Sequence, residues 1–286
     1  MNYKQKYLSE KPKLPVYHYT TQEGLIGIVK SKQLWATRIH YLNDSTEFSY
    51  AADILKNGIR NSIREVPVHL KPIVQELNEW IERVSRISIY VCSFSEEKDL
   101  LSQWRGYTQN GIGFSVGFDF EHIYPLLDKQ KFTISKCIYD ESVQYSIIQE
   151  MINIFVTNFS NSEKEPYKNR LYEYEEYYEK FINEFIQIAP ILKHPSYEEE
   201  KEWRLISKPI SSSDLGVEYR TGASMLIPYY KLNLCEGGNT MLVHEIIVGP
   251  TQIPDLSRAS VFDLLYSNKI RINSVSSSLI PYRPWI

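Results

Sequence analysis

Short runs of β-forming residues follow one another closely in the last third of the chain, and they constrain the fold more than any other feature. The runs are Glu202–Lys208, Gly216–Arg220, Ser224–Tyr230 and His244–Pro250, with a fifth at Ile270–Ser276. Runs of this length and composition read as strands. Strands in close succession, with helices before and between them, indicate an α+β fold with a core of short, mostly antiparallel strands and flanking helices.

The chain opens with a strand, a tight turn and a helix. Leu14–Thr20 contains a short β-type run. Thr20 and Glu23 then fit a capping box, in which Thr20 is the N-cap and the Glu23 side chain reaches back to it. The residues that follow carry apolar side chains at helical spacing, so we expect a helix there.

Further elements are predicted along the rest of the chain. We expect strands at Gln33–Thr37, Ile87–Ser95, Gly111–Asp119 and Lys131–Tyr139. We expect helices from a cap at Asp44 or Ser45 to about Asn57, and at Val68–Val84, Glu97–Tyr107, Tyr145–Phe159, Leu171–Ile188 and Asp255–Ser267. Two of these helices interrupt the β segments. The sequence therefore predicts one domain over residues 1–286, with a helical insertion at about 141–190.

Composition and net charge argue against one class of function, nucleic-acid binding by a strongly basic surface. Hydrophobic residues make up 43% of the chain and charged residues 23%, which is ordinary for a globular protein in water. The formal net charge is −3, so a strongly basic surface for nucleic acid is not expected.

The cysteines and the apolar segments bear on compartment. Cys92, Cys137 and Cys235 are far apart and never in C-x-x-C spacing, so we expect neither a disulfide framework nor a metal site. The first residues have no apolar core of signal-peptide length. No stretch approaches the ~20 apolar residues of a membrane helix. We therefore expect a reduced, cytoplasmic protein with no membrane partner.

The run Tyr197–Ile206 (YEEEKEWRLI) places four glutamates at the entry of a predicted strand. In extended backbone, residues two apart share a face, so Glu200 and Glu202 should lie side by side, with Lys201 on the opposite face. Two adjacent carboxylates repel, and at least one should bind a cation or a sugar hydroxyl, or have a raised pKa. A solvated acidic turn is the plain alternative and, taken alone, the more common one.

Other polar side chains stand at strand ends. His18 lies in the first strand, just before the capped helix, where a side chain can reach a cleft. Ser93 and Ser95 end another strand, and their spacing puts both hydroxyls on one face, where they could orient a ligand or a catalytic side chain. The plain alternatives are a hydrogen-bonded histidine and strand termination by small polar residues.

Six motifs, taken together, resemble those of a known bacterial family. They are VYHYTTQEGLIGIVKSKQLWAT, LNDSTEF, VCSFSEEKDLLSQWRGY, GIGFSVGFD, EEEKEWRLI and HEIIVGP. The chain resembles the domain of unknown function 2971 family, over most of its length outside the helical insertion. The name of that family implies no activity.

The order of three elements carries a second, more distant resemblance. They are His18 in the first strand, S-F-S at Ser93–Ser95, and E-x-E at Glu200–Glu202. This order resembles that of ADP-ribosyltransferases, which have a first-strand Arg or His, a Ser-Thr-Ser or tyrosine element, and a final glutamate. The sequence departs from that pattern in reading S-F-S, and in having His18 where E-x-E enzymes usually have Arg. The resemblance implies an ADP-ribosyltransferase-like fold with NAD as substrate.

The same resemblance implies roles for individual residues. His18 would hydrogen-bond the ribose of NAD, and Ser93 would help position the catalytic glutamate, with Ser95 as a further residue of the NAD site. Glu202 would bind the nicotinamide ribose 2′-hydroxyl and stabilise the oxocarbenium-like charge that develops as nicotinamide leaves. Glu200 would help to activate the acceptor. On this basis Glu202→Gln should abolish nicotinamide release and leave the fold intact.

Aromatic side chains could stack on the nicotinamide ring, and Tyr19, Trp104 and Tyr107 are the candidates. The implied activity is transfer of ADP-ribose from NAD to a protein or nucleic-acid acceptor, in a setting such as bacterial conflict or phage defence, and a regulatory partner protein is a further expected partner.

Two other classes of function remain open at this point. One is a non-catalytic module that binds a nucleotide or a partner in the same cleft, which the imperfect motifs favour. The other is a metal-dependent nuclease centred on Glu199 and Lys201, although the sequence shows no aspartate at the partner position of such a motif.

Overall fold

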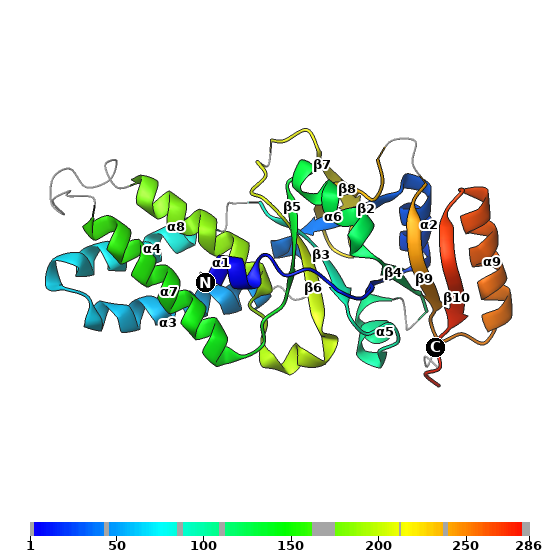
Figure 1. Cartoon of the computed structure of the whole chain (residues 1–286), viewed down its shortest axis with the longest axis horizontal. Helices are drawn as coiled ribbons and strands as arrows, with labels where there is room; N and C mark the ends of the chain where they lie inside the picture. The colour runs from blue at the N-terminus through cyan, green and yellow to red at the C-terminus, as the bar shows by residue number, and fades with distance from the viewer. Residues whose placement is uncertain are drawn as a thin grey trace.

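The computed structural model describes residues 3–42, 46–84, 88–108, 112–161, 175–211, 213–236 and 240–281. They form a sheet part and, beside it, a lobe of helices (Figure 1). The strands are β1 (Val16–Thr20), β2 (Gln33–Arg38), β3 (Tyr90–Ser95), β4 (Phe114–Phe118), β5 (Phe132–Lys136), β6 (Glu202–Ser207), β7 (Val217–Thr221), β8 (Leu226–Asn233), β9 (Leu242–Val248) and β10 (Arg271–Ser277). The α-helices are α1 (Tyr3–Tyr7), α2 (Gln22–Ser31), α3 (Thr46–Glu65), α4 (Lys71–Val84), α5 (Leu101–Tyr107), α6 (Phe120–Lys129), α7 (Glu141–Ser160), α8 (Glu175–Ile188) and α9 (Pro254–Ser267).

The strands of the described residues form one sheet of ten. Its main order is β10-β9-β4-β1-β3-β2-β8-β7, and β6 joins β3 and carries β5 on its other edge. Strands β9 and β10 pair in parallel, and the other pairs are antiparallel. The prediction of an α+β fold with short, mostly antiparallel strands is therefore confirmed.

Strand β3 is the branch point of the sheet. One of its edges pairs with β6 from Val91 to Ser95. The other edge pairs with β2 at Tyr90 and Val91 and with β1 at Ser95. Because a strand has only two edges, β1 and β2 must share this one and part from each other along it. The residues of β3 between the two pairings are consequently not covered by a neighbouring strand on that side.

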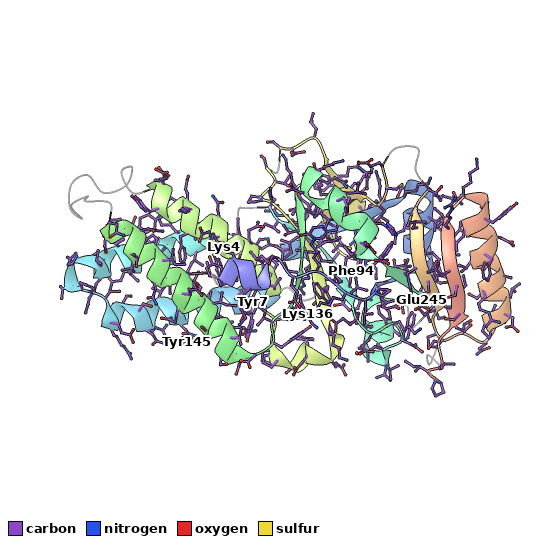
Figure 2. All side chains as sticks on the ribbon, in the orientation of Figure 1. Lys4, Tyr7, Phe94, Lys136, Tyr145 and Glu245 are labelled. Carbon is purple, nitrogen blue, oxygen red and sulfur yellow. The ribbon has the colours of Figure 1, made fainter. Side chains whose placement is uncertain are left out.

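The sheet part has its own apolar core, which is made by side chains from both strands and helices. Strand β4 is buried along its whole length, as expected for a strand covered on both faces. Phe94 of β3 lies inside the sheet part (Figure 2), edge-on to Phe118 and Phe120 with ring centroids 6.0 and 5.3 Å apart. Aromatic pairs of this kind fix the packing as well as fill the core.

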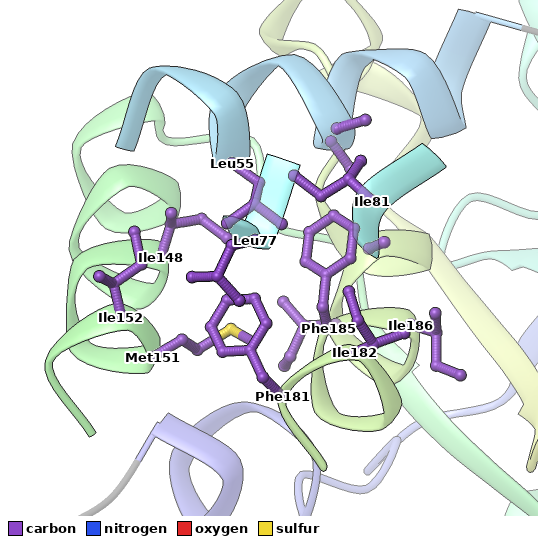
Figure 3. Packing of buried hydrophobic residues seen from close by; sticks show 14 of the residues in the cluster. Leu55, Leu77, Ile81, Ile148, Met151, Ile152, Phe181, Ile182, Phe185 and Ile186 are labelled. Carbon is purple, nitrogen blue, oxygen red and sulfur yellow. The ribbon is translucent and has the colours of Figure 1, made fainter. Parts of the chain in front are cut away.

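The helical lobe has a second core. Leu55, Leu77, Ile148, Phe181 and Phe185 come from four helices and pack together (Figure 3). Helices α7 and α8, which were expected as an insertion, pack here against α3 and α4 from the first third of the chain. The lobe is therefore assembled from two distant segments, and Tyr145 of α7 lies on its surface (Figure 2).

The predicted N-cap of α2 needs correction. The N-cap of α2 is Thr21, whose side chain accepts a hydrogen bond from the Gly24 amide at 3.2 Å. Thr20 was expected there, but its backbone is held in the sheet opposite Phe114. Helix α6 was not predicted, since it lies between two clear strands and contains Pro125. The expected cap at Asp44 or Ser45 lies outside the described residues.

Within the part of the chain that the structure describes, no helix combines the length and the apolar character needed to span a bilayer.

Candidate functional site

A cleft of about 650 Å³ opens where β1 and β2 part along β3. Its volume is in the usual range for small-ligand sites, about 300–1,000 Å³. The walls come from β1, β2 and β3, from helices α2 and α5, and from the hairpin of β7 and β8. The predicted site residues that line it are His18, Tyr19, Ser93, Tyr107, Glu200 and Glu202. Ser95 and Trp104 do not line it.

His18 projects from the middle of β1 and is half-buried. Its Nδ1 lies 2.9 Å from the carbonyl oxygen of Ser93. A carbonyl only accepts, so Nδ1 carries the proton and Nε2 is a hydrogen-bond acceptor. Burial lowers the pKa of His18, and the positive charge of Arg220 lowers it further. The hydrogen bond to Ser93 acts in the opposite direction, but burial outweighs it. His18 is therefore neutral at pH 7 and suited to accept a hydrogen bond from a hydroxyl group.

The thiol of Cys92 lies beside this histidine, with Sγ 3.7 Å from Nδ1. Burial raises the pKa of Cys92 to about 12, and the charge of Glu202 acts in the same direction. Because only the thiolate is a good nucleophile, Cys92 and His18 do not form an activated cysteine–histidine pair. The thiol is part of the apolar floor of the cleft.

Glu200 and Glu202 meet, but not through the extended backbone that was expected. Glu200 ends the 3-10 turn η4 (Pro195–Glu200), Lys201 is left-handed with φ 44°, and β6 starts only at Glu202. The side chains of Glu200 and Glu202 are 12% and 3% exposed. Both bind the Nζ of Lys193, at 2.7 and 2.5 Å. The two carboxylates thus converge on a shared cation.

A second cation completes this buried cluster. Arg204 binds the Oε1 of Glu202 through Nε at 2.7 Å and Oε2 through a terminal nitrogen at 2.9 Å. Its other terminal nitrogen donates to the carbonyl of Pro190 at 2.7 Å. Burial alone would raise the pKa of Glu202, but the charges of Arg204 and Lys193 outweigh it and lower the pKa to about 2. Glu202 is therefore ionised, and two cations and two carboxylates balance one another.

The two serines have different surroundings. Ser93 is half-buried at the cleft, and its carbonyl holds His18. Ser95 is 1% exposed, and its hydroxyl donates to the carbonyl of Glu200 at 2.6 Å and accepts from the Glu97 amide at 2.9 Å. Ser95 thus holds the backbone of the turn that carries Glu200. Any action of Ser95 on a ligand would be indirect.

The three aromatic candidates also differ. Tyr107 lines the cleft together with Glu200 and Glu202. Burial raises the pKa of Tyr107, and the charges of the two carboxylates raise it further. The Tyr19 hydroxyl donates to the Glu97 carbonyl at 2.8 Å. Trp104 is 0% exposed, packs edge-on to Tyr19 with centroids 4.7 Å apart, and donates from Nε1 to Asp99. Its ring supports the wall of the cleft from behind, and no face of it can stack on a ligand there.

The remaining glutamates of the run Tyr197–Ile206 are solvated. Glu198 and Glu199 are exposed, and Lys201 forms an ion pair with Glu97 at 2.5 Å. Among the described residues, no group of three or more histidine, cysteine, aspartate or glutamate side chains is arranged to hold a metal ion.

Sequence reasoning missed several residues of the cleft and of the ion cluster. Arg204 could have been found, since it stands two residues after Glu202 on one strand and so shares its face. Lys193 carries no local signal, because it lies in an irregular segment between two 3-10 turns. Trp35, Thr37 and Arg220 line the cleft only because β2, β7 and β8 are neighbours in the sheet.

The comparisons with known proteins agree with one of the two resemblances. Residues 103–205 match a family model described as "Protein of unknown function (DUF2971)". The matched stretch begins in α5 and ends in β6, so it includes Tyr107, Lys193, Glu200, Glu202 and Arg204. No curated protein and no solved structure matches the chain.

Proposed function

We propose that the cleft binds NAD and that the chain is an ADP-ribosyltransferase-like enzyme, with a fold of that kind. The observation that carries the proposal is the meeting of His18, Tyr107 and the Glu200–Glu202 pair at one cleft. These residues come from β1, from α5, and from the end of η4 and the start of β6, which are far apart in the sequence. A solvated surface turn would not place its glutamates at the same cleft as a histidine of the first strand.

The local chemistry suits a ribose with a leaving group. Neutral His18 would accept a hydrogen bond from a ribose hydroxyl, and Tyr107 would offer a ring beside it. Glu202 would supply a fixed negative charge near C1′, although Arg204 and Lys193 reduce its field. Glu200 is the more exposed carboxylate, and we assign it contact with the incoming acceptor.

In the proposed reaction, the bond between ribose C1′ and the nicotinamide nitrogen breaks, and its electron pair leaves with neutral nicotinamide. The positive charge that develops on the ribose is stabilised by the carboxylates. A nucleophile of a protein or nucleic-acid acceptor, or water, then forms the new bond to C1′. Its proton passes to Glu200. No metal or redox partner is needed for this balance.

The experiment is a measurement of nicotinamide release from NAD by chromatography, followed by transfer of labelled ADP-ribose to lysate components. Glu200→Gln is expected to reduce label transfer by roughly a hundredfold. The matched control is Glu198→Gln, which changes an exposed glutamate of the same turn and should match the wild type. Absence of nicotinamide release together with absence of NAD binding would rule the proposal out.

A second candidate is a module that binds a nucleotide without cleaving it. The observation in its favour is the pairing of both Glu202 oxygens with cations. A carboxylate neutralised in this way stabilises an oxocarbenium ion less than an unpaired one. Calorimetry with NAD, combined with analysis of the ligand after the titration, separates the two, because a binding module returns NAD intact.

A further inference from the structure

The cleft has a second wall that plays no part in the proposed bond cleavage. It is made by one face of β2 and by the hairpin of β7 and β8. Trp35 and Thr37 are two residues apart on β2 and therefore share a face. Thr37 pairs with Tyr229 of β8, and Ile227 of β8 pairs with Arg220 of β7. Trp35, Thr37, Ile227 and Arg220 all line the cleft.

Arg220 brings a positive charge to this wall. Its guanidinium donates to the Thr37 hydroxyl at 3.2 Å. Among the described residues, no carboxylate forms an ion pair with it. The contrast with Arg204 is direct, because Arg204 is buried and its charge is matched by Glu202. An arginine at a cleft without a matching carboxylate is suited to bind an anion, and its planar fork fits a phosphate group.

Arg220 lines the same cleft as His18 and Cys92. The positive charge of Arg220 acts to lower the pKa of both residues, although burial keeps the pKa of Cys92 raised. A ligand that places a ribose at His18 would bring the attached phosphate toward Arg220.

Trp35 supplies a flat aromatic surface at the same wall. Its ring stacks on Tyr229 with centroids 4.4 Å apart and an angle of 19°, yet the residue is 42% exposed. One ring face is thus covered, and the exposed area belongs to the other face and the edges. Tyr229 is itself held, since its hydroxyl donates to Glu218 at 2.7 Å. A large exposed aromatic side chain supported from behind is a typical stacking platform for a nucleobase.

The two side chains lie at the same wall of the cleft. Trp35 stands two residues from Thr37, whose hydroxyl accepts a hydrogen bond from Arg220, and the Cα atoms of residues two apart on a strand are separated by roughly 6.6 Å. We propose that Trp35 and Arg220 form a nucleobase-and-phosphate subsite, which binds the adenosine diphosphate half of a dinucleotide. The proposal rests on the proposed function for the other half, since the nicotinamide end would lie by His18, Tyr107 and Glu200.

The test uses ADP as the probe, because ADP has the base and the phosphates but no nicotinamide bond to cleave. Quenching of tryptophan fluorescence reports on stacking at Trp35, since the other described tryptophans, Trp80, Trp104 and Trp203, are buried. Calorimetry gives the dissociation constants of ADP and adenosine in parallel. We expect ADP to quench the fluorescence and Trp35→Phe to abolish most of that quenching.

The variants separate the two parts of the subsite. Arg220→Gln should weaken ADP binding about tenfold or more and leave adenosine binding nearly unchanged, because only ADP carries phosphate. Arg271→Gln is the matched control, since Arg271 is an exposed strand arginine on β10, at the other end of the sheet. Trp35→Leu should weaken ADP and adenosine alike by about tenfold, whereas Trp35→Tyr should retain most of the affinity.

The result that would overturn the subsite is ADP binding that neither Arg220→Gln nor Trp35→Leu changes, or no ADP binding by a protein that binds NAD. Nicotinamide release is measured separately on the same preparations. Release without ADP quenching contradicts the subsite and retains the proposed enzyme. ADP quenching without release retains the subsite and contradicts cleavage of NAD.

Discussion

The carboxylate of Glu202 is enclosed by Arg204 and Lys193, and all three side chains are almost completely buried. A buried charge in contact with its counter-ions is tolerated, but one left without them is costly. The arrangement makes Glu202 a structural residue whatever its role toward a ligand. The expectation that Glu202→Gln would leave the fold intact is therefore not supported by its surroundings.

We predict that Glu202→Gln lowers the free energy of unfolding by about 3–5 kcal/mol, since it leaves Arg204 and Lys193 with one carboxylate between them. Urea unfolding followed by circular dichroism measures the change. Glu198→Gln, on the exposed side of the same turn, should stay within about 0.5 kcal/mol of the wild type. A Glu202→Gln protein as stable as the wild type would mean that the buried cluster contributes nothing to the fold.

The pH dependence of stability follows from the same carboxylate. Its pKa is lowered from 4.5 to about 2 in the folded protein, so the folded state binds fewer protons than the unfolded chain. The stabilisation is complete above about pH 4.5 and is lost progressively as the pH falls toward 2. We expect the free energy of unfolding to fall over this window, and to fall less steeply in Glu202→Gln. Parallel curves for the two proteins would contradict the assignment.

At the scale of the element, helix α2 presents bare backbone to the cleft at Gly27. A Cβ added there would meet no atom within 4 Å, whereas one on Gly24 would overlap the Thr20 hydroxyl. Helix α2 thus has one glycine, Gly27, with open space beside it, and one, Gly24, whose neighbours leave no room for a side chain. The open space beside Gly27 belongs to the cleft.

Gly27→Ala should raise the free energy of unfolding by about 0.5–1 kcal/mol, because glycine is unfavourable in a helix interior. Gly24→Ala should show no such gain, since the Thr20 side chain would have to move. Gly27→Leu should fold and lower the affinity for NAD and ADP by filling the cleft. Thermal unfolding and calorimetry check these outcomes, and unchanged ligand affinity in Gly27→Leu would place the ligand elsewhere.

At the scale of the whole molecule, the helical lobe is joined to the cleft by a chain of hydrogen bonds. Gln144 of α7 accepts from the Tyr50 hydroxyl at 2.8 Å and donates to the carbonyls of Ile138 and Lys193 at 2.6 and 2.8 Å. The Lys193 side chain then reaches Glu200 and Glu202. The lobe therefore helps to set the position of both carboxylates.

We predict that Gln144→Leu lowers the free energy of unfolding by about 1–3 kcal/mol, because the buried Lys193 carbonyl loses its side-chain donor and the Ile138 carbonyl keeps only the Lys193 amide. It should also weaken NAD binding, since Lys193 loses its anchor. Gln149→Leu is the control, as Gln149 lies on the same helix and, among the described residues, its side chain bonds Ser62 and Gly58 within the lobe. If the two variants lower NAD affinity equally, the effect is one of general stability and not of this connection.

The sequence by itself determined the class of fold and most of the elements. Strand and helix patterns are local, so the runs at β1, β3 and β6 and the helices α7 and α8 could be read from neighbouring residues. The same local rules pointed to His18, Ser93, Glu200 and Glu202. These rules did not predict helix α6, because Pro125 is a local signal against a helix, and they did not predict the cap at Thr21, because sheet pairing holds the backbone of Thr20.

Only the tertiary structure decided what surrounds those residues. The branching of the sheet at β3 brings β1 and β2 to one edge and so forms the cleft. Packing of α5 on β1 buries Trp104, pairing of β2, β8 and β7 brings Trp35 and Arg220 to one wall, and contacts with the helical lobe hold Lys193 beside two carboxylates. Contacts between residues far apart in a chain depend on which strands pair and which faces are covered. No spacing rule along the sequence carries that information.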